Sequence, residues 1–224
     1  MLIVFDLDGT LVDSAQDLAE SASELVQIYG ASPMAVSDVA AMVGDGAAVL
    51  VRRALAHASL DPDMPGALDR FLAIYDRRLL DHTVAYDGMR EALALSTYLG
   101  PMGVLTNKPL APSLRLLEGL GLRGFFADVI GGDGVHPRKP DPAGLRALMA
   151  ACPETPVVVV GDSPADARTA EAAGCLCCLA RYGFGVVRFD GNWPDTPYVV
   201  DHPRELPGVL ERIALAGTRG ATES

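Results

Sequence analysis

Four mostly apolar runs lie along the chain, and each ends at a glycine or at polar residues. They are Leu2–Phe5, Met102–Leu105, Ala127–Gly131 and Pro156–Val160. Continuous apolar runs of this length are typical of strands in a parallel sheet, because helices cover both faces of such a sheet. The last run contains four consecutive valines and predicts a fully buried strand. Two shorter runs, Leu176–Leu179 and Tyr198–Val200, predict two more strands.

Segments with apolar residues three or four positions apart lie between the strands, and this spacing predicts amphipathic helices. Between residues 15 and 82 no strand is predicted, and the helices expected there are Ser14–Tyr29, Ala47–His57 and Gly66–Leu80. Later helices are expected at Pro142–Ala151, Pro164–Ala173 and Glu205–Leu215, with residues 216–224 as a frayed tail. Strands that alternate with helices predict an α/β fold, here a doubly wound, Rossmann-like parallel sheet with a helical segment inserted after its first strand.

Length and charge narrow the class of protein. A chain of 224 residues can form one core with a smaller inserted domain. No apolar run reaches the roughly 18 residues of a membrane span, and the first residues lack the basic region of a signal peptide. We therefore expect a cytoplasmic location. The net charge of -11 argues against nucleic acid and anionic membranes as partners, although an anionic small molecule remains possible.

Two carboxylates follow the first predicted strand. Asp6 and Asp8 are two positions apart, so their side chains can project to the same side where the strand ends. Open α/β sheets bind ligands at this edge. Two neighbouring carboxylates repel each other and favour a hard divalent cation such as Mg²⁺. An ordinary turn after a strand is the alternative, because Asp and Gly are common turn residues.

The valine-rich run also ends in acids, since Asp162 and Asp166 follow it. Thr106 and Asn107 follow the second predicted strand and offer groups that can bind phosphate oxygens. Of the 18 basic residues, only two are lysines, Lys108 and Lys139, and both precede a proline. A general preference for arginine in this sequence could leave two lysines by chance. The functional interpretation is that a compact ammonium group is needed at both positions.

These residues resemble the motifs of the haloacid dehalogenase-like superfamily. The segment from Asp6 to Ser14 resembles its first motif, Thr106 the second, Lys139 in Lys-Pro-Asp-Pro the third, and Gly-Asp162 with Asp166 the fourth. The resemblance covers almost the whole chain. It implies a catalytic core at residues 1–14 and 83–224 and a cap of four helices at 15–82, with hinges at 13–14 and 82–88.

The resemblance also implies roles for these residues. Asp6 would be the nucleophile and Asp8 the general acid and base. Mg²⁺ would be held by the Asp6 carboxylate, the Asp8 backbone carbonyl and Asp162, with Asp166 outside the coordination sphere. Thr106, Asn107 and Lys139 would bind the phosphoryl group of the substrate.

Two further segments are similar to phosphoglycolate phosphatases. One runs from Gly44 to Leu55 in the expected cap, and the other is the loop Arg181–Gly185. Arg53 in the first segment could bind a substrate carboxylate. Asp45, between two glycines, departs from the family pattern, in which that position is often neutral. The expected substrate is a small phosphate ester, with 2-phosphoglycolate first.

Other functions are compatible with the same motifs. One is a β-phosphoglucomutase-like phosphotransferase, and another is a phosphatase for sugar phosphates or nucleotides. Dehalogenation is disfavoured because dehalogenases lack an acid at the position of Asp8. A phosphate-binding regulatory module without catalysis is the alternative outside enzymes, and the sequence gives no oligomeric state.

Overall fold

The computed structural model describes residues 1–153 and 156–220. Six strands form one sheet: β1 (Leu2–Phe5), β4 (Met102–Leu105), β5 (Asp128–Ile130), β6 (Val157–Gly161), β7 (Leu176–Ala180) and β8 (Val199–Val200). Their order is β5-β4-β1-β6-β7-β8, and every neighbouring pair is parallel. The chain winds outward from β1 first to one side and then to the other. The predicted doubly wound α/β fold is therefore confirmed, and its switch point lies between β1 and β6.

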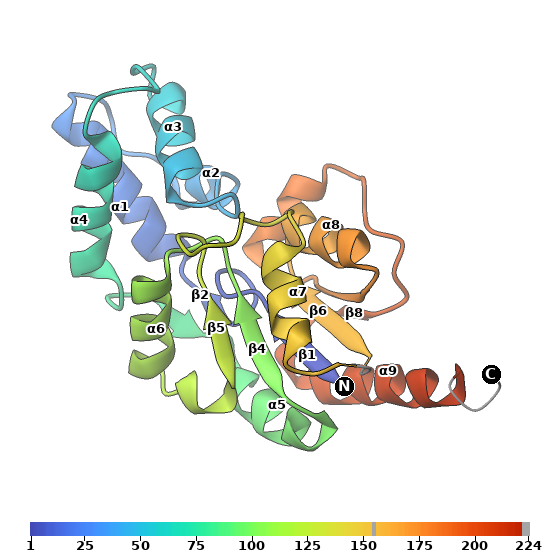
Figure 1. Ribbon diagram of the computed structural model, residues 1–224. Coiled ribbons are helices and arrows are strands. Elements are labelled where there is room, and N and C mark those ends of the chain that lie inside the picture. Colours follow the sequence, from blue (N-terminus) through green and yellow to red (C-terminus); the bar gives the residue numbers. More distant parts are fainter. Residues whose placement is uncertain (154–155, 221–224) are drawn as a thin grey trace.

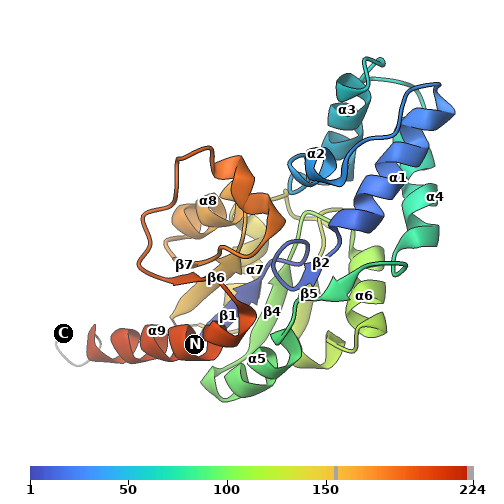
Figure 2. The same cartoon turned by 180° about the vertical axis from the view of Figure 1, so that it is seen from behind.

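Helices cover both faces of the sheet (Figures 1 and 2). One face carries α5 (Met89–Ser96), α6 (Leu110–Gly119) and α9 (Leu206–Gly220), and the other carries α7 (Ala143–Ala150) and α8 (Pro164–Ala173). Successive residues of β1 point to opposite faces, so Ile3 and Phe5 join the first apolar cluster while Leu2 and Val4 join the second. Burial of both faces explains why this strand is a continuous apolar run.

Four helices stand together above the carboxyl edge of the sheet, and we call them the helical bundle (Figure 1). They are α1 (Ala15–Ile28), α2 (Val36–Ala40), α3 (Ala47–His57) and α4 (Ala67–Arg78). Their apolar faces meet in a buried interior that includes Leu25, Leu55 and Phe71. The short helix α2 is the member that the spacing of apolar residues did not predict.

The two chain segments that connect the helical bundle to the sheet are paired with each other. Strands β2 (Val12–Asp13) and β3 (Val84–Ala85) form a two-stranded antiparallel ribbon. The buried Asp17 carboxylate, at the start of α1, accepts hydrogen bonds from the Thr83 N–H at 2.8 Å and the Thr83 hydroxyl at 2.6 Å. These contacts hold the two connections side by side. Two-residue strands leave no periodicity in the sequence, so neither was predicted.

Helices α5 and α6 were also not predicted. The closing helix α9 runs through Gly220, beyond the predicted end at Leu215, so the expected frayed tail is wrong for residues 216–220. No proline follows Pro207 to interrupt the helix. The end of the tail, 221–224, lies outside the described residues. Within the described part of the chain, no helix has the length and apolarity needed to cross a membrane.

Candidate active site

The site lies at the carboxyl edge of the sheet, beside the switch point. Asp6 follows β1 and Asp162 follows β6, two strands that pair directly, with Phe5 opposite Val160. The Asp6 N–H donates to the Val160 carbonyl at 2.9 Å, which fixes this register at the strand ends. Carboxylate oxygens of Asp6, Asp162 and Asp166 lie within 4.8 Å of one another, and all three residues are buried.

A buried lysine joins two of these acids. The Lys139 ammonium lies 2.8 Å from Asp6 Oδ1 and 2.5 Å from Asp166 Oδ1, and its side chain is 3% exposed. Asn107 holds the backbone of Lys139: its Oδ1 accepts from the Lys139 N–H at 2.8 Å, and its Nδ2 donates to the Lys139 carbonyl at 3.0 Å. The loops after β4 and β5 and the helix α8 therefore meet beside Asp6.

Asp166 is held from two sides. Besides Lys139, it accepts hydrogen bonds from the Ser163 N–H at 3.0 Å and the Ser163 hydroxyl at 2.6 Å, both on Oδ2. Ser163 and Asp166 together form the capping box at the start of α8. The carboxylate therefore caps a helix and fixes the lysine beside Asp6 at the same time.

Asp162 is enclosed by glycines. Gly185 donates its N–H to Asp162 Oδ2 at 2.7 Å, and the Thr10 hydroxyl donates to Oδ1 at 3.2 Å. A Cβ on Gly9, whose φ is +86°, would lie 2.0 Å from Asp162 Oδ2, and one on Gly183 would lie 2.2 Å from the Gly9 carbonyl oxygen. Glycine is therefore required where the first loop and the loop after β7 meet around this carboxylate.

This cluster contains three carboxyl groups and one ammonium group, so negative charge is in excess when all are ionised. Burial and the neighbouring Asp166 raise the pKa of Asp6 to about 7, although Lys139 opposes the shift. Burial, Asp6 and Asp166 raise the pKa of Asp162 well above its ordinary value. Burial works against the charge of Lys139, but Asp166 and Asp6 raise the pKa of Lys139 above its usual range. Hard oxygen donors that repel one another are the donor set that suits a divalent cation such as Mg²⁺.

Asp8 lies on the side facing the helical bundle. Its Oδ1 accepts from the Ser14 hydroxyl at 2.6 Å, and both of its oxygens lie 3.1 Å from the Lys108 ammonium. Lys108 also donates to the Tyr75 hydroxyl at 2.6 Å and lies 4.4 Å from the centre of the Tyr75 ring. Because Tyr75 belongs to α4, this chain of contacts connects Asp8 to the helical bundle.

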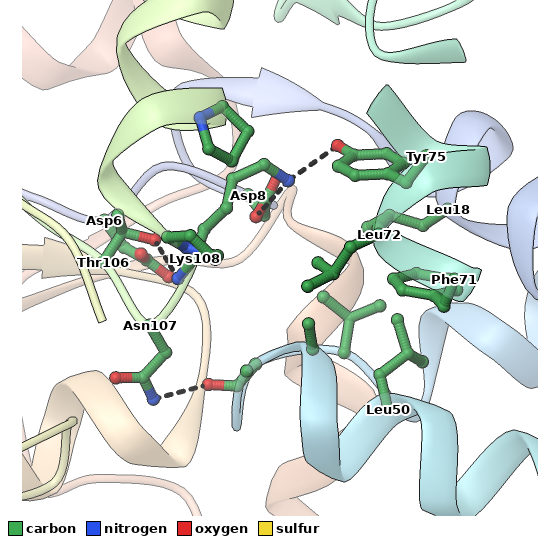
Figure 3. A pocket seen from close by; sticks show the side chains of 16 residues that line it. Asp6, Asp8, Leu18, Leu50, Phe71, Leu72, Tyr75, Thr106, Asn107 and Lys108 are labelled. Carbon is green, nitrogen blue, oxygen red and sulfur yellow. Dashed lines mark hydrogen bonds and ion pairs between the residues drawn. The ribbon is translucent and has the colours of Figure 1, made fainter. Parts of the chain in front are cut away.

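A cavity of about 50 Å³ lies between the sheet and the helical bundle (Figure 3). Its polar lining comes from the sheet loops and consists of Asp6, Asp8, Thr106, Asn107 and Lys108. The helical bundle contributes mainly apolar side chains: Leu18, Val43, Ala47, Leu50, Phe71 and Leu72, with Tyr75 beside them. In Figure 3 the labelled leucines and Phe71 lie across the cavity from Asp6, Thr106 and Asn107.

Arg53 lies apart from these residues. It donates to the Met42 carbonyl at 2.9 Å and lies 2.7 Å from Asp45 Oδ2, and it is not among the described residues that line the cavity. Asp45 also pairs with Arg188, which belongs to the sheet domain and donates to the Val43 carbonyl at 2.7 Å. The unusual acid between the two glycines thus connects the helical bundle to the core. The predicted role of Arg53 in substrate binding stays a prediction.

The structure brings most of the predicted site residues together. These are Asp6, Asp8, Thr106, Asn107, Lys139, Asp162 and Asp166. Lys108, Tyr75 and Thr10 were not among the predicted site residues. Lys108 carried a signal, as one of only two lysines, but Tyr75 is simply an aromatic residue on a predicted helix.

Known proteins match the chain over most of its length. The haloacid dehalogenase-like hydrolase family matches residues 1–174. A phosphoglycolate phosphatase from Pseudomonas syringae pv. tomato is 39% identical, over 94% of this chain and 80% of its own length. One from Cereibacter sphaeroides is 37% identical, over 94% of this chain and 98% of its own length. A crystal structure from Haemophilus somnus, described as a predicted phosphoglycolate phosphatase, has a TM-score of 0.82 with 27% identity, covering 93% of this chain and 96% of that one.

The chain therefore belongs to the haloacid dehalogenase-like hydrolase family, as its motifs predicted. It is an enzyme of the phosphatase class within that family.

Proposed function

We propose that the protein is a Mg²⁺-dependent phosphatase that hydrolyses 2-phosphoglycolate through an aspartyl-phosphate on Asp6. The observation that carries this proposal is the position of Asp6, buried between the Lys139 ammonium at 2.8 Å and the carboxylate of Asp162. A carboxylate that attacks a phosphate needs a neighbouring positive charge to offset their repulsion, and Lys139 provides one.

The residues that would hold the ion are the carboxylates of Asp6 and Asp162 and the backbone carbonyl of Asp8. The raised pKa values of Asp6 and Asp162 support this site, because both carboxylates lack sufficient compensating charge. When bound, Mg²⁺ supplies the charge that offsets repulsion between a carboxylate and a phosphate. Asp166 would act indirectly, by holding Lys139 at 2.5 Å.

The side chains divide the reaction into two steps. Asp6 attacks phosphorus, so a bond to Asp6 forms as the bond to the leaving oxygen breaks, and Asp8 donates a proton to that oxygen. A water molecule then attacks the phosphorus of the aspartyl-phosphate, Asp8 takes its proton, and phosphate leaves with Asp6 restored. General acid and base catalysis of this kind contributes about 10²–10⁴-fold in rate. Lys139, Thr106 and Asn107 would hold and position the phosphoryl oxygens.

The helical bundle would serve as a mobile cap, with residues 15–82 moving against a core of 1–14 and 83–224. A cavity of about 50 Å³ has room for only a few water molecules, at ~10–15 Å³ each, and a phosphate ester is larger. The bundle must shift to admit it. The ribbon of β2 and β3 joins both connections, so it is where we expect the chain to bend.

The relatives and the lining of the cavity support the choice of substrate. Both curated relatives described above are named phosphoglycolate phosphatase. The apolar side chains of the helical bundle, such as Leu50 and Leu72, provide no hydrogen-bond partners for the hydroxyl groups of a sugar. We therefore favour a small leaving group over a hexose or a nucleoside. The cytoplasmic location expected from the sequence stays a prediction.

Phosphate release from a panel of esters tests the proposal. We expect Mg²⁺-dependent release from 2-phosphoglycolate, and less from hexose phosphates, nucleotides and pyrophosphate. Asp6→Asn should abolish turnover, because the amide cannot form the aspartyl-phosphate. Asp128→Asn makes the same change at an exposed carboxylate on β5 and should leave the rate unchanged.

Other outcomes would select other functions. Turnover by Asp6→Asn would refute the nucleophile. Transfer of the phosphoryl group back to a sugar, with little phosphate released, would indicate a phosphotransferase. Binding of phosphate analogues without hydrolysis of any ester would indicate a regulatory module.

A further inference from the structure

The two lysines near the site have different surroundings. Lys139 lies between Asp6 and Asp166, beside the position where phosphorus would be attacked. Lys108 lines the cavity, and its ammonium contacts Asp8 and the hydroxyl of Tyr75. Its side chain is 5% exposed. The proposed mechanism uses Lys139 but gives Lys108 no role.

The position of Asp8 indicates where the leaving group lies. Asp8 protonates the ester oxygen in the proposed mechanism, so that oxygen must come within hydrogen-bond distance of its carboxylate. Anything attached to the oxygen extends from there toward the helical bundle. Lys108, 3.1 Å from both oxygens of Asp8, and Tyr75 are the polar side chains that line the cavity at this point (Figure 3).

An anionic leaving group needs a positive partner in this cavity. The wall formed by Leu50, Phe71 and Leu72 cannot hydrogen-bond to a carboxylate, and a buried charge without a partner is costly. Among the described residues that line the cavity, Lys108 is the one cationic side chain. Arg53 is instead engaged with Asp45 and the Met42 carbonyl.

We propose that Lys108, supported by Tyr75, binds the carboxylate of the leaving group and thereby selects an acidic phosphate ester over a neutral one. This inference rests on the proposed function and names the residue that recognises the substrate. An ammonium group has three protons to donate, so a carboxylate in the cavity becomes a further acceptor beside Asp8 and Tyr75. In 2-phosphoglycolate the carboxylate carbon is two bonds from the ester oxygen, which suits a cation adjacent to Asp8.

Comparing two substrates tests carboxylate binding by Lys108 separately from its other effects on the rate. Phosphoglycolate and ethyl phosphate have leaving groups of similar length, and only the first carries a carboxylate. Lys108→Met also removes the partner of Asp8, but this loss affects both esters alike. We expect the ratio of kcat/KM for phosphoglycolate to that for ethyl phosphate to fall about 10- to 100-fold, the range for a hydrogen bond to a charged group.

Three further variants sharpen the test. Tyr75→Phe keeps the ammonium in place and should lower the ratio only a few-fold, and it remains informative if Lys108→Met does not fold. Arg53→Met tests the alternative that Arg53 binds the substrate carboxylate, and we expect it to preserve the preference for phosphoglycolate. Arg52→Met changes an exposed arginine that pairs with Asp63 and should alter neither rate.

The possible results separate this inference from the proposed function. If Lys108→Met lowers both rates equally, or if the wild type shows no preference between the esters, the inference is overturned while the phosphatase stands. If Arg53→Met removes the preference, the carboxylate site belongs to Arg53. If the wild type hydrolyses neither ester, the proposed function fails and the inference fails with it.

Discussion

The two walls of the cavity are built in opposite ways. The wall from the sheet is polar and includes buried charges held by several partners, as Asp6 is by Lys139 and the Leu7 N–H. The wall from the helical bundle consists of apolar side chains on helix faces, such as Leu50 and Phe71, with Tyr75 as the polar side chain beside them. One wall is fixed by the pairing of strands, and the other by the packing of helices above it.

The two walls are therefore suited to different tasks. The charged wall is suited to catalysis, and the apolar wall to limiting which substrates fit. Charged groups accelerate a reaction when the protein holds them in place before the substrate arrives, and burial strengthens their effect. An apolar wall chiefly limits size, since a pocket of this kind discriminates weakly between similar molecules. We therefore expect changes in the sheet wall to reduce the rate for every ester, except at Lys108, whose proposed partner is the leaving group. Changes in the contacts of the bundle should alter affinity and preference.

The largest effect is expected from Lys139→Met. The change leaves Asp6 and Asp166 buried without their shared cation, which costs about 3–5 kcal/mol in the free energy of unfolding. In the proposed mechanism the change also removes a donor to the phosphoryl group, so kcat should fall by about 10²–10³-fold. Urea unfolding and the rates of phosphate release measure the two effects.

The neighbouring Arg138 provides the matched control. It is exposed and donates to the Gly132 carbonyl, so Arg138→Met should change the free energy of unfolding by less than ~0.5 kcal/mol. If Lys139→Met destabilised the protein no more than this control, the sheet wall would not depend on buried charge pairs.

The second prediction concerns pH in the metal-free protein. The pKa of Asp6 is about 7 in the folded state and near its ordinary 3.8 in the unfolded chain. The folded state therefore retains a proton that the unfolded chain releases, so the free energy of unfolding falls as pH rises from about 4 to 7 and then levels. The loss should be on the order of 2–4 kcal/mol.

Urea unfolding in EDTA at pH 5 and pH 8 measures this loss. Asp6→Asn removes the titrating group, so the variant should lose less stability than the wild type between these pH values. Added Mg²⁺ should restore stability to the wild type at pH 8, because the proposed ion compensates the carboxylates. An equal pH dependence in both proteins would exclude Asp6 as the source.

The smallest effect is expected from Asp45→Asn. Burial opposes the charge of Asp45, but Arg188 and Arg53 hold its pKa below the ordinary value, and this acid joins the helical bundle to the core. Because the carboxylate is partly exposed, its loss should cost about 1 kcal/mol or less. We expect KM to rise by no more than about fivefold, with kcat nearly unchanged.

Asp63→Asn removes the same charge as Asp45→Asn, but from an ion pair in a different place. Asp63 pairs with Arg52, and both residues belong to the helical bundle. This ion pair therefore does not connect the bundle to the sheet. Its loss should not change KM. Equal effects of the two variants on KM would show that the contact between Asp45 and Arg188 does not hold the bundle against the sheet.

The sequence alone determined the elements that leave a local pattern of apolar and polar residues. Apolar runs gave the buried strands, as in Val157–Gly161, because strands covered on both faces exclude polar residues. Acids directly after such runs, Asp6 and Asp162, had to lie at one edge of a parallel sheet. Their convergence was therefore predictable from the sequence.

Only the tertiary structure decided which residues face the site from the helical bundle. Tyr75 reaches Lys108 because of how α4 packs above the sheet, and Arg53 turns to Asp45 for the same reason. Nothing in the helical spacing distinguishes a residue that faces the cavity from one that faces the bundle interior. Strand ends are brought together by backbone hydrogen bonds, whereas contacts between the bundle and the sheet depend on side chains far apart in the chain, and those follow from packing alone.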